Sequence, residues 1–521
     1  MECGQGTLPR PPNMISNQPF STERLPRVTR HPGSTPTERF LKTLCDHSFL
    51  SLWSYPNIFR DQKAGKGGDG KELCDVLVVF GDDILIFSDK NCEFPSTGDI
   101  ALDWSRWYRR AIGSSADQAW GAERWIREHP DRIFVDRACT QPFPLDLPQP
   151  DKMRFHHIVV AHNISDRCRE YFSGGSGTLM FDSDVTPAGQ SDRLTCEPFK
   201  IGWFDPGRTF IHVLDDVSLR IVLSTRDTIT DFLHYVRTKE RFLRQLQKEA
   251  KHFYCAGEEE LLAQYFLTFE DNEHGFKDTS GFSGISIVEG DWKFFEESPE
   301  RAAQLEADRI SYAWDGLIEK FNENILGGTS YYASDPKIGN REKAIRFLAR
   351  EPRVRRRMLA EAFLGLLEIA KPTQRANRVI FPSNSGDPHY CLLLLPKLPG
   401  VSYEEYREGR RQFLEVCCYV TKLVCPDALD IVALATENSR EINRSEDALY
   451  FDARFWDKEM QEQAQTWQRD LGLLVNLTRF EEKVSEFPDV PPRRVSPPGP
   501  NPRNKPCPCG SGKKYKRCHG G

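Results

Sequence analysis

The chain has 521 residues, which is enough for about three domains of ordinary size. Apolar residues make up 39% and charged residues 28% of it, a globular composition that excludes collagen-like, mucin-like and wholly disordered chains. The formal net charge of −6 excludes a uniformly basic nucleic-acid-coating protein, so any polyanion must meet a local basic surface.

The N-terminal sequence predicts a leader and no targeting or membrane segment. Residues 1–35 contain six prolines and little periodic apolarity, which is typical of a disordered leader. They lack the charged-then-apolar order of a signal peptide, and no apolar run approaches the roughly 20 residues that cross a bilayer. Twelve of the 15 cysteines are scattered, as in proteins of a reducing compartment. We therefore expect a cytoplasmic, bacterial protein.

Residues 36–250 predict an α/β unit, because apolar residues switch between helical and alternating spacing. The expected elements are a helix from Glu38 that ends before Pro56, strands at 72–80 and 83–90 joined by a tight turn at Gly81-Asp82, a long or broken helix at 101–129, and strands at 132–136 and 154–163.

The remaining chain predicts a multidomain α/β (α+β) protein. Residues 251–370 are mainly helical by pattern, and 371–485 predict a small α/β domain with strands near 377–381, 389–395 and 429–436. Residues 486–506 hold eight prolines and predict a semi-rigid linker before the last segment, 507–521.

The strongest chemical signal lies in the last segment, CPCGSGKKYKRCHGG. Three thiols and an imidazole fall within thirteen residues, a ligand set that suits tetrahedral Zn²⁺. These candidate ligands are Cys507, Cys509, Cys518 and His519. A segment this short cannot bury a core, so metal binding would supply its folding energy.

These residues resemble the SEC-C motif, the zinc-binding module at the C-terminus of the SecA translocation ATPase. They match its C-x-C-x8-C-H pattern without departure over residues 505–521. In that family the motif binds zinc and contacts a secretion chaperone and the ribosome, so the resemblance implies docking of a protein partner. The basic contact surface would be Lys513, Lys514, Lys516 and Arg517. The alternative is a free cysteine cluster.

A second candidate site lies on the predicted hairpin. Ser88 and Lys90 share one face of the second strand, because side chains alternate along a strand. The tight turn can bring Asp75 of the first strand near them.

This arrangement resembles the core of PD-(D/E)xK nucleases, in which an acidic residue on one strand and an acid-x-Lys on the next hold a divalent metal. The order of helix, hairpin, helix and strand agrees with that core. The resemblance implies that Asp75 binds Mg²⁺ or Mn²⁺ and that Lys90 positions the water or offsets charge. Gln118 would face the site from the following helix, and Glu38 would be the auxiliary acid of the first helix.

The sequence departs from the nuclease pattern at one position. Ser88 stands where the family has Asp or Glu, and Asp89 would point to the opposite face. One carboxylate fewer lowers the affinity for a divalent ion. The alternative interpretation is that Asp75 and Lys90 are ordinary surface charges.

The helix predicted at 101–129 interleaves aromatic and basic residues. Its tryptophans are Trp104, Trp107, Trp120 and Trp125. Its arginines are Arg106, Arg109, Arg110, Arg124 and Arg127. Aromatic residues at helical spacing favour a core role, so the arginines are the better candidates for contact with a phosphate backbone.

Two functions remain as hypotheses. The first is a metal-dependent endonuclease that acts on a nucleic acid, with the zinc motif as a docking module. The second is a non-enzymatic zinc-binding adaptor in which the nuclease-like domain has lost catalysis and only binds. Ser88 favours the adaptor, whereas Asp75 together with Lys90 favours the enzyme.

Overall fold

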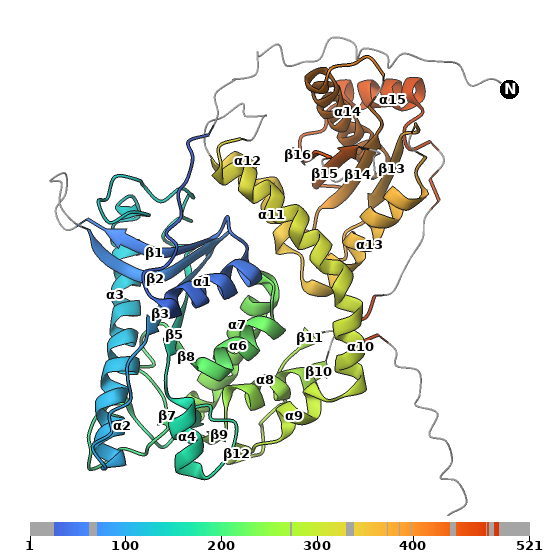
Figure 1. The fold of residues 1–521 in the computed structure, drawn as a ribbon. Helices are drawn as coiled ribbons and strands as arrows, with labels where there is room; N and C mark the ends of the chain where they lie inside the picture. Colours follow the sequence, from blue (N-terminus) through green and yellow to red (C-terminus); the bar gives the residue numbers. More distant parts are fainter. Residues whose placement is uncertain are drawn as a thin grey trace, which may run out of the picture.

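The structure is a computed structural model, and its helices and strands alternate along the chain (Figure 1), which confirms the mixed α/β multidomain class. It describes residues 25–61, 70–270, 273–329, 338–371, 373–384, 386–397, 399–437, 444–475, 477–478 and 484–488. Within these residues, no helix combines the length and low charge that spanning a membrane requires.

A six-stranded mixed sheet forms the centre of the N-terminal unit. Its order is β4 (Ile133–Phe134), β1 (Ser54–Arg60), β2 (Lys71–Phe80), β3 (Asp83–Lys90), β5 (Arg154–Ala161) and β8 (Ile211–Asp215). Strands β1, β2 and β3 are antiparallel neighbours, whereas β3, β5 and β8 run parallel. The carboxyl ends of three strands therefore meet at one edge.

Helices cover both faces of this sheet. Phe49 of α1 (Pro36–Phe49) packs 6.0 Å from Phe87, whereas Gln118 of α3 (Ser114–Glu128) contacts Ser88. Since Phe87 and Ser88 are consecutive in β3, α1 and α3 lie on opposite faces. The other helices of this unit are α2 (Ile100–Tyr108), the π-helical turn η1 (Arg109–Gly113), α4 (Ser165–Phe172), α5 (Pro187–Gln190), α6 (Asp216–Thr225) and α7 (Ile229–Lys248).

The helix of two to three turns predicted from Glu38 does end before Pro56, but the sequence did not predict the strand that follows it. The helix stops at Phe49, and residues 54–60 form β1. Pro56 pairs with Val76 of β2, but β4 pairs only with the last two residues of β1. Pro56 therefore lies where one side of β1 has no partner in the sheet, and a missing N–H costs little there.

Residues 25–35, expected to belong to a disordered leader, pack on the body. Leu25 is buried, and the Val28 N–H donates to the Leu326 carbonyl at 2.8 Å. Arg30 pairs with Asp46 of α1.

A second, smaller sheet joins strands from both sides of residue 250, where we expected a domain boundary. Its order is β12 (Gly284–Ile287), β9 (His252–Cys255), β6 (Met180–Asp182) and β7 (Lys200–Ile201). The physical unit therefore extends beyond residue 250. A short hairpin of β10 (Phe269–Glu270) and β11 (Glu273–His274) follows α8 (Glu258–Leu267).

Helices α10 to α12 lie between the N-terminal unit and a C-terminal α/β unit (Figure 1). The helices of this middle region are α9 (Asp291–Glu296), α10 (Pro299–Asp308), the 3₁₀ turn η2 (Arg309–Ser311), α11 (Tyr312–Leu326), α12 (Ile338–Arg350) and α13 (Arg353–Ile369). The Tyr390 hydroxyl of the C-terminal unit donates to Glu351 at 2.6 Å, so the units share a buried contact.

The C-terminal unit is a four-stranded sheet. Its order is β13 (Ala376–Ile380), β14 (His389–Leu395), β15 (Asp430–Glu437) and β16 (Glu446–Asp452). β14 and β15 are parallel and are connected by α14 (Tyr403–Val424), and α15 (Lys458–Leu471) packs against α14. Ser402 caps α14 with Glu405 in the expected capping box.

Residues 484–488 lie on the helical middle, although the expected linker begins at 486. Glu486 accepts hydrogen bonds from Arg226 at 3.1 Å and Gln304 at 3.0 Å, and His274 Nε2 lies 2.9 Å from its other oxygen. The ring of Phe487 packs 6.2 Å from Phe295. The segment that leads to the proline-rich sequence is therefore anchored.

Candidate metal and nucleic-acid site

The hairpin of β2 and β3 brings Asp75 beside the second strand. Val76 pairs with Phe87, which places Asp75 opposite Ser88 on the same face. The Asp89 backbone N–H donates to Asp75 Oδ2 at 2.7 Å. The carboxylate thus satisfies a backbone donor at the end of β3.

Asp75 is only 4% exposed, and this burial dominates its ionisation. Burial raises the pKa of Asp75 to about 7, and the charge of Glu72 adds to that rise. The Asp89 N–H and the charge of Lys90 act in the opposite direction. A divalent ion would therefore compete with a proton for this carboxylate at neutral pH.

Gln118 lies where the sequence predicted, facing the hairpin from α3. The hydroxyl of Ser88, which is fully buried, donates to Gln118 Oε1 at 3.4 Å. Lys90 is half-buried, and within the described residues its ammonium group has no ion pair. The structure thus places Asp75, Ser88 and Gln118 as neighbours and leaves the Lys90 charge available for an anion.

Glu38 does not join this group. The Glu38 carboxylate accepts hydrogen bonds from the Ser34 N–H at 2.7 Å and from Asn57 Nδ2 at 2.9 Å, and Asn57 also donates to Glu72. Burial opposes its ionisation, but these hydrogen bonds outweigh burial and lower the pKa of Glu38. It caps α1 and does not contact Asp75.

A buried histidine that the sequence did not predict lies between two carboxylates at the same end of the sheet. His162 Nε2 lies 2.5 Å from Asp89 Oδ1, and His162 Nδ1 lies 2.5 Å from Asp216 Oδ1. Burial lowers the pKa of His162, but the two carboxylates outweigh burial and raise it to about 9. The signal available in the sequence was a polar residue directly after two parallel strands, His162 after β5 and Asp216 after β8.

No three-ligand metal group includes Asp75 among the residues that the structure describes. There, one group of His, Cys, Asp or Glu side chains brings three ligand atoms within 4.8 Å of one another: Asp182, Asp184 and His252. Asp182 already binds the Lys200 ammonium at 2.8 Å. The hairpin therefore offers a divalent ion fewer carboxylates than a nuclease site would.

The helices α2 and α3 separate their aromatic and basic residues only in part, because Trp120 and Trp125 are half-buried. Trp104 and Trp107 are fully buried, whereas all five arginines are exposed. Arg110 donates to the Glu93 carbonyl at 3.5 Å, three residues beyond Lys90. Arg110 also belongs to η1, and π-helical turns inside helices are frequent at functional sites. Arg110 therefore lies near the Lys90 end of β3, whereas Arg127 packs on Phe155 at the opposite end of the sheet.

The four candidate zinc ligands, Cys507, Cys509, Cys518 and His519, lie outside the described residues. The SEC-C motif family matches residues 503–521. The chain therefore carries a module of a zinc-binding type at this position. No curated protein and no solved structure matches the chain, so no homologue supports the nuclease resemblance.

Proposed function

We propose that this chain is a zinc-containing adaptor that docks a protein partner through its SEC-C motif and binds nucleic acid through its N-terminal unit. The match of residues 503–521 to the SEC-C motif carries the first part of the proposal. The exposed arginines of α2 and η1, of which Arg110 donates to the Glu93 carbonyl three residues beyond Lys90, support the second part, because cationic side chains bind the phosphate backbone.

The zinc site of this proposal has four protein ligands. Cys507, Cys509, Cys518 and His519 would complete a tetrahedral shell, which leaves no open position for catalysis. The intervening basic residues would then face the partner.

Elemental analysis of the purified chain tests this site. We expect one zinc per chain, and we expect it to be lost when Cys507→Ala is combined with Cys509→Ala. The matched control combines Cys92→Ala with Cys139→Ala, two half-buried cysteines outside the motif, and should keep its zinc. Absence of zinc from the wild type, or retention by the first variant, would refute the site.

Binding without efficient cleavage fits the hairpin best. The Asp75 carboxylate is buried and accepts a backbone hydrogen bond. A metal ion would compete with a proton for it near neutral pH. Ser88 contributes no charge to a metal. A divalent ion would thus meet a single carboxylate that is also partly protonated. That is the lower limit of the one or two carboxylates such ions usually take, so the site would be weak.

A metal-dependent endonuclease is the second candidate, favoured by the chain topology. The core of the N-terminal unit runs in the order helix, three antiparallel strands, helical segment and strand. The last strand, β5, is parallel to β3, and Asp75 lies opposite Ser88. That order agrees with the nuclease resemblance.

Fluorescently labelled DNA and RNA oligonucleotides, incubated with Mg²⁺ or Mn²⁺, separate the two candidates. The adaptor predicts binding without cleavage, and it predicts that Lys90→Ala reduces the slope of log affinity against log salt by about one. The enzyme predicts Mn²⁺-dependent cleavage that Asp75→Asn abolishes. Ser88→Asp, which restores a carboxylate with the smallest side chain for this buried position, should then increase cleavage.

A wild-type chain that neither binds nor cleaves these oligonucleotides at low salt would refute both candidates for the hairpin. Circular dichroism of each variant shows whether the fold is intact. The zinc measurement is independent of this result, because it concerns a different segment of the chain.

A further inference from the structure

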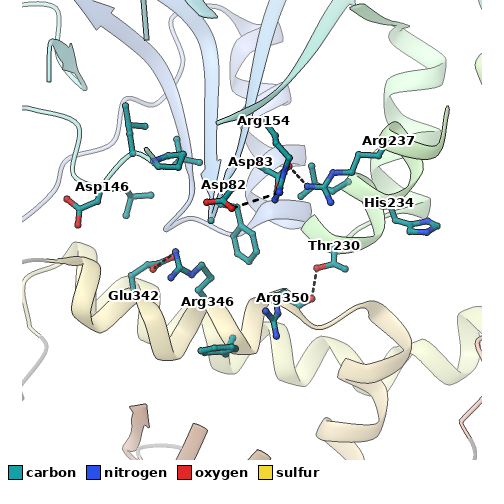
Figure 2. A pocket seen from close by; sticks show the side chains of 18 of the residues that line it. Asp82, Asp83, Asp146, Arg154, Thr230, His234, Arg237, Glu342, Arg346 and Arg350 are labelled. Carbon is teal, nitrogen blue, oxygen red and sulfur yellow. Dashed lines mark hydrogen bonds and ion pairs between the residues drawn. The ribbon is translucent and has the colours of Figure 1, made fainter. Parts of the chain in front are cut away.

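A cleft of about 960 Å³ opens between the β2–β3 turn, α7 and α12 (Figure 2). It lies beside Asp83, at the start of β3, whereas Lys90 ends that strand. Eight residues of strand place the two ends roughly 23 Å apart. The cleft is therefore separate from the hairpin site, and its volume lies within the range of small-molecule sites.

Two helices present arginine pairs to this cleft. Arg237 and Arg241 are four residues apart on α7, and Arg346 and Arg350 have the same spacing on α12. Residues at this spacing share a helix face, so each helix directs two guanidinium groups toward the same space. Figure 2 shows Arg237 and Arg350 on opposite walls. A guanidinium group is well suited to bind phosphate in a bidentate manner.

Some of the acidic residues of the cleft are already neutralised within its walls. Asp83 is 5% exposed and is shared by Arg154, Arg237 and His156. Glu342 is 8% exposed and accepts a hydrogen bond from the Trp53 indole N–H at 2.6 Å. These two carboxylates therefore offer little to repel an anion in the cleft.

Of the other acids, Asp82 lies 3.9 Å from the Arg154 guanidinium, whereas Asp146 (Figure 2) and Glu273 lie at the edges of the cleft. Asp82 belongs to the β2–β3 turn and Asp146 to the loop before β5, and Figure 2 shows Asp146 at the end of the cleft farthest from Arg237. The Glu273 side chain is 77% exposed at the rim.

Arg241 has no hydrogen bond or ion pair with any described residue. Arg237, by contrast, pairs with Asp83, Arg346 with Glu342 at 3.5 Å and Arg350 with Asp387 at 3.2 Å. Arg241 is therefore the most open of the four guanidinium groups to a ligand.

Aromatic rings complete the lining. Phe80 and Phe347 both border the cleft, and the Arg350 guanidinium lies 4.9 Å from the centre of the Phe347 ring. Such stacking restricts the guanidinium before any ligand binds. Phe80 is only 5% exposed and the Phe347 ring stacks on Tyr450 at 5.6 Å, so the two rings offer the cleft apolar contact at their edges.

We propose that this cleft binds a nucleotide. Its phosphates would bind the arginines of α7 and α12, and its base would lie against the apolar edges of Phe80 and Phe347. An exocyclic amino group of the base would donate to Asp82 or Asp146. Each part of the ligand has a complementary group on the corresponding wall.

Isothermal titration calorimetry of the full chain with GTP, CTP, UTP and pyrophosphate tests this proposal. We expect GTP and CTP, whose bases carry amino groups, to bind more tightly than UTP and pyrophosphate. Arg241→Ala should weaken every nucleotide about tenfold or more, because it removes a charged hydrogen-bond donor. Asp146→Ala should weaken GTP and CTP while leaving pyrophosphate unchanged.

Two control variants separate this cleft from other sites. Arg309→Ala removes an exposed arginine of η2 outside both sites and should leave nucleotide affinity unchanged. Lys90→Ala removes the hairpin cation and should do the same, because the hairpin is a separate site. Loss of nucleotide binding in Lys90→Ala would place the ligand at the hairpin and overturn the proposal. So would the absence of binding at millimolar nucleotide, equal affinity for GTP and pyrophosphate, or unchanged affinity in Arg241→Ala.

Discussion

Neutralising Glu486 should destabilise the helical middle. The side chain of this residue is 23% exposed and lies between Arg226 and His274, whose side chains are 6% and 4% exposed. Burial opposes its ionisation, but the hydrogen bond with His274 and the charge of Arg226 outweigh burial and lower the pKa of Glu486 to about 2. Glu486→Gln keeps the shape of the side chain and removes only its charge.

The size of the effect follows from the pKa. A fall from the ordinary value of 4.5 to about 2 corresponds to roughly 3 kcal/mol in the free energy of unfolding. Because Arg226 keeps Asp231 as a partner, the cost should lie near the lower end of the range for broken buried pairs. For a cooperative unit of 150–250 residues, this loss of about 3 kcal/mol in the free energy of unfolding corresponds to a fall in melting temperature of roughly 6–12 °C.

Differential scanning calorimetry between pH 2 and pH 7 measures this effect. A carboxyl with a lowered pKa stabilises the fold fully above its ordinary pKa and loses that contribution as the pH falls toward the folded value. The melting temperatures of the wild type and Glu486→Gln should therefore differ at pH 7 and converge near pH 2. Glu300→Gln, which removes an exposed charge from α10, is the matched control.

An equal melting temperature for Glu486→Gln and Glu300→Gln at pH 7 would refute this reasoning. A difference that persists unchanged at pH 2 would show instead that the shape of the anchor matters and not its charge.

Three further predictions concern stability. The pKa of Asp75 is raised from 3.8 to about 7, so the wild type should lose stability as the pH rises through this window. In thermal melts, the melting temperature of Asp75→Asn should therefore rise relative to that of the wild type between pH 5 and pH 8. The pKa of His162 is raised to about 9, so the destabilisation caused by His162→Gln should be full below pH 6.5 and shrink as the pH passes 9. A chain of residues 1–488 should melt like the full chain, whereas a chain of residues 1–483 should melt several degrees lower, since it lacks the anchor.

Local signals in the sequence were sufficient to predict the hairpin. Strands β2 and β3 lie within one residue of their predicted bounds, because alternating β-branched residues flank a glycine that adopts a φ of 61°. The strand before them, β1, was not predicted, since Tyr55 and Ile58 fit a helical spacing as well as a buried strand.

Contacts between distant residues could not be predicted in the same way. His162 joins Asp89 across 73 residues, and Glu486 joins Arg226 across 260. The spacing of apolar residues along the chain cannot predict such pairs, because they depend on how whole helices and strands pack against one another. The same holds for the cleft, whose walls come from β2, α7 and α12. The candidate site was predictable to the extent that it lies on one hairpin.

The anchored segment also limits where a captured partner can go. Cys507 follows Pro488 by 19 residues, and a chain of that length spans at most about 60 Å. A partner held by the SEC-C motif would share a volume of that radius with the helical middle, which corresponds to an effective concentration on the order of 1 mM. Contacts between partner and body that are too weak to form in solution could therefore form once the motif is engaged.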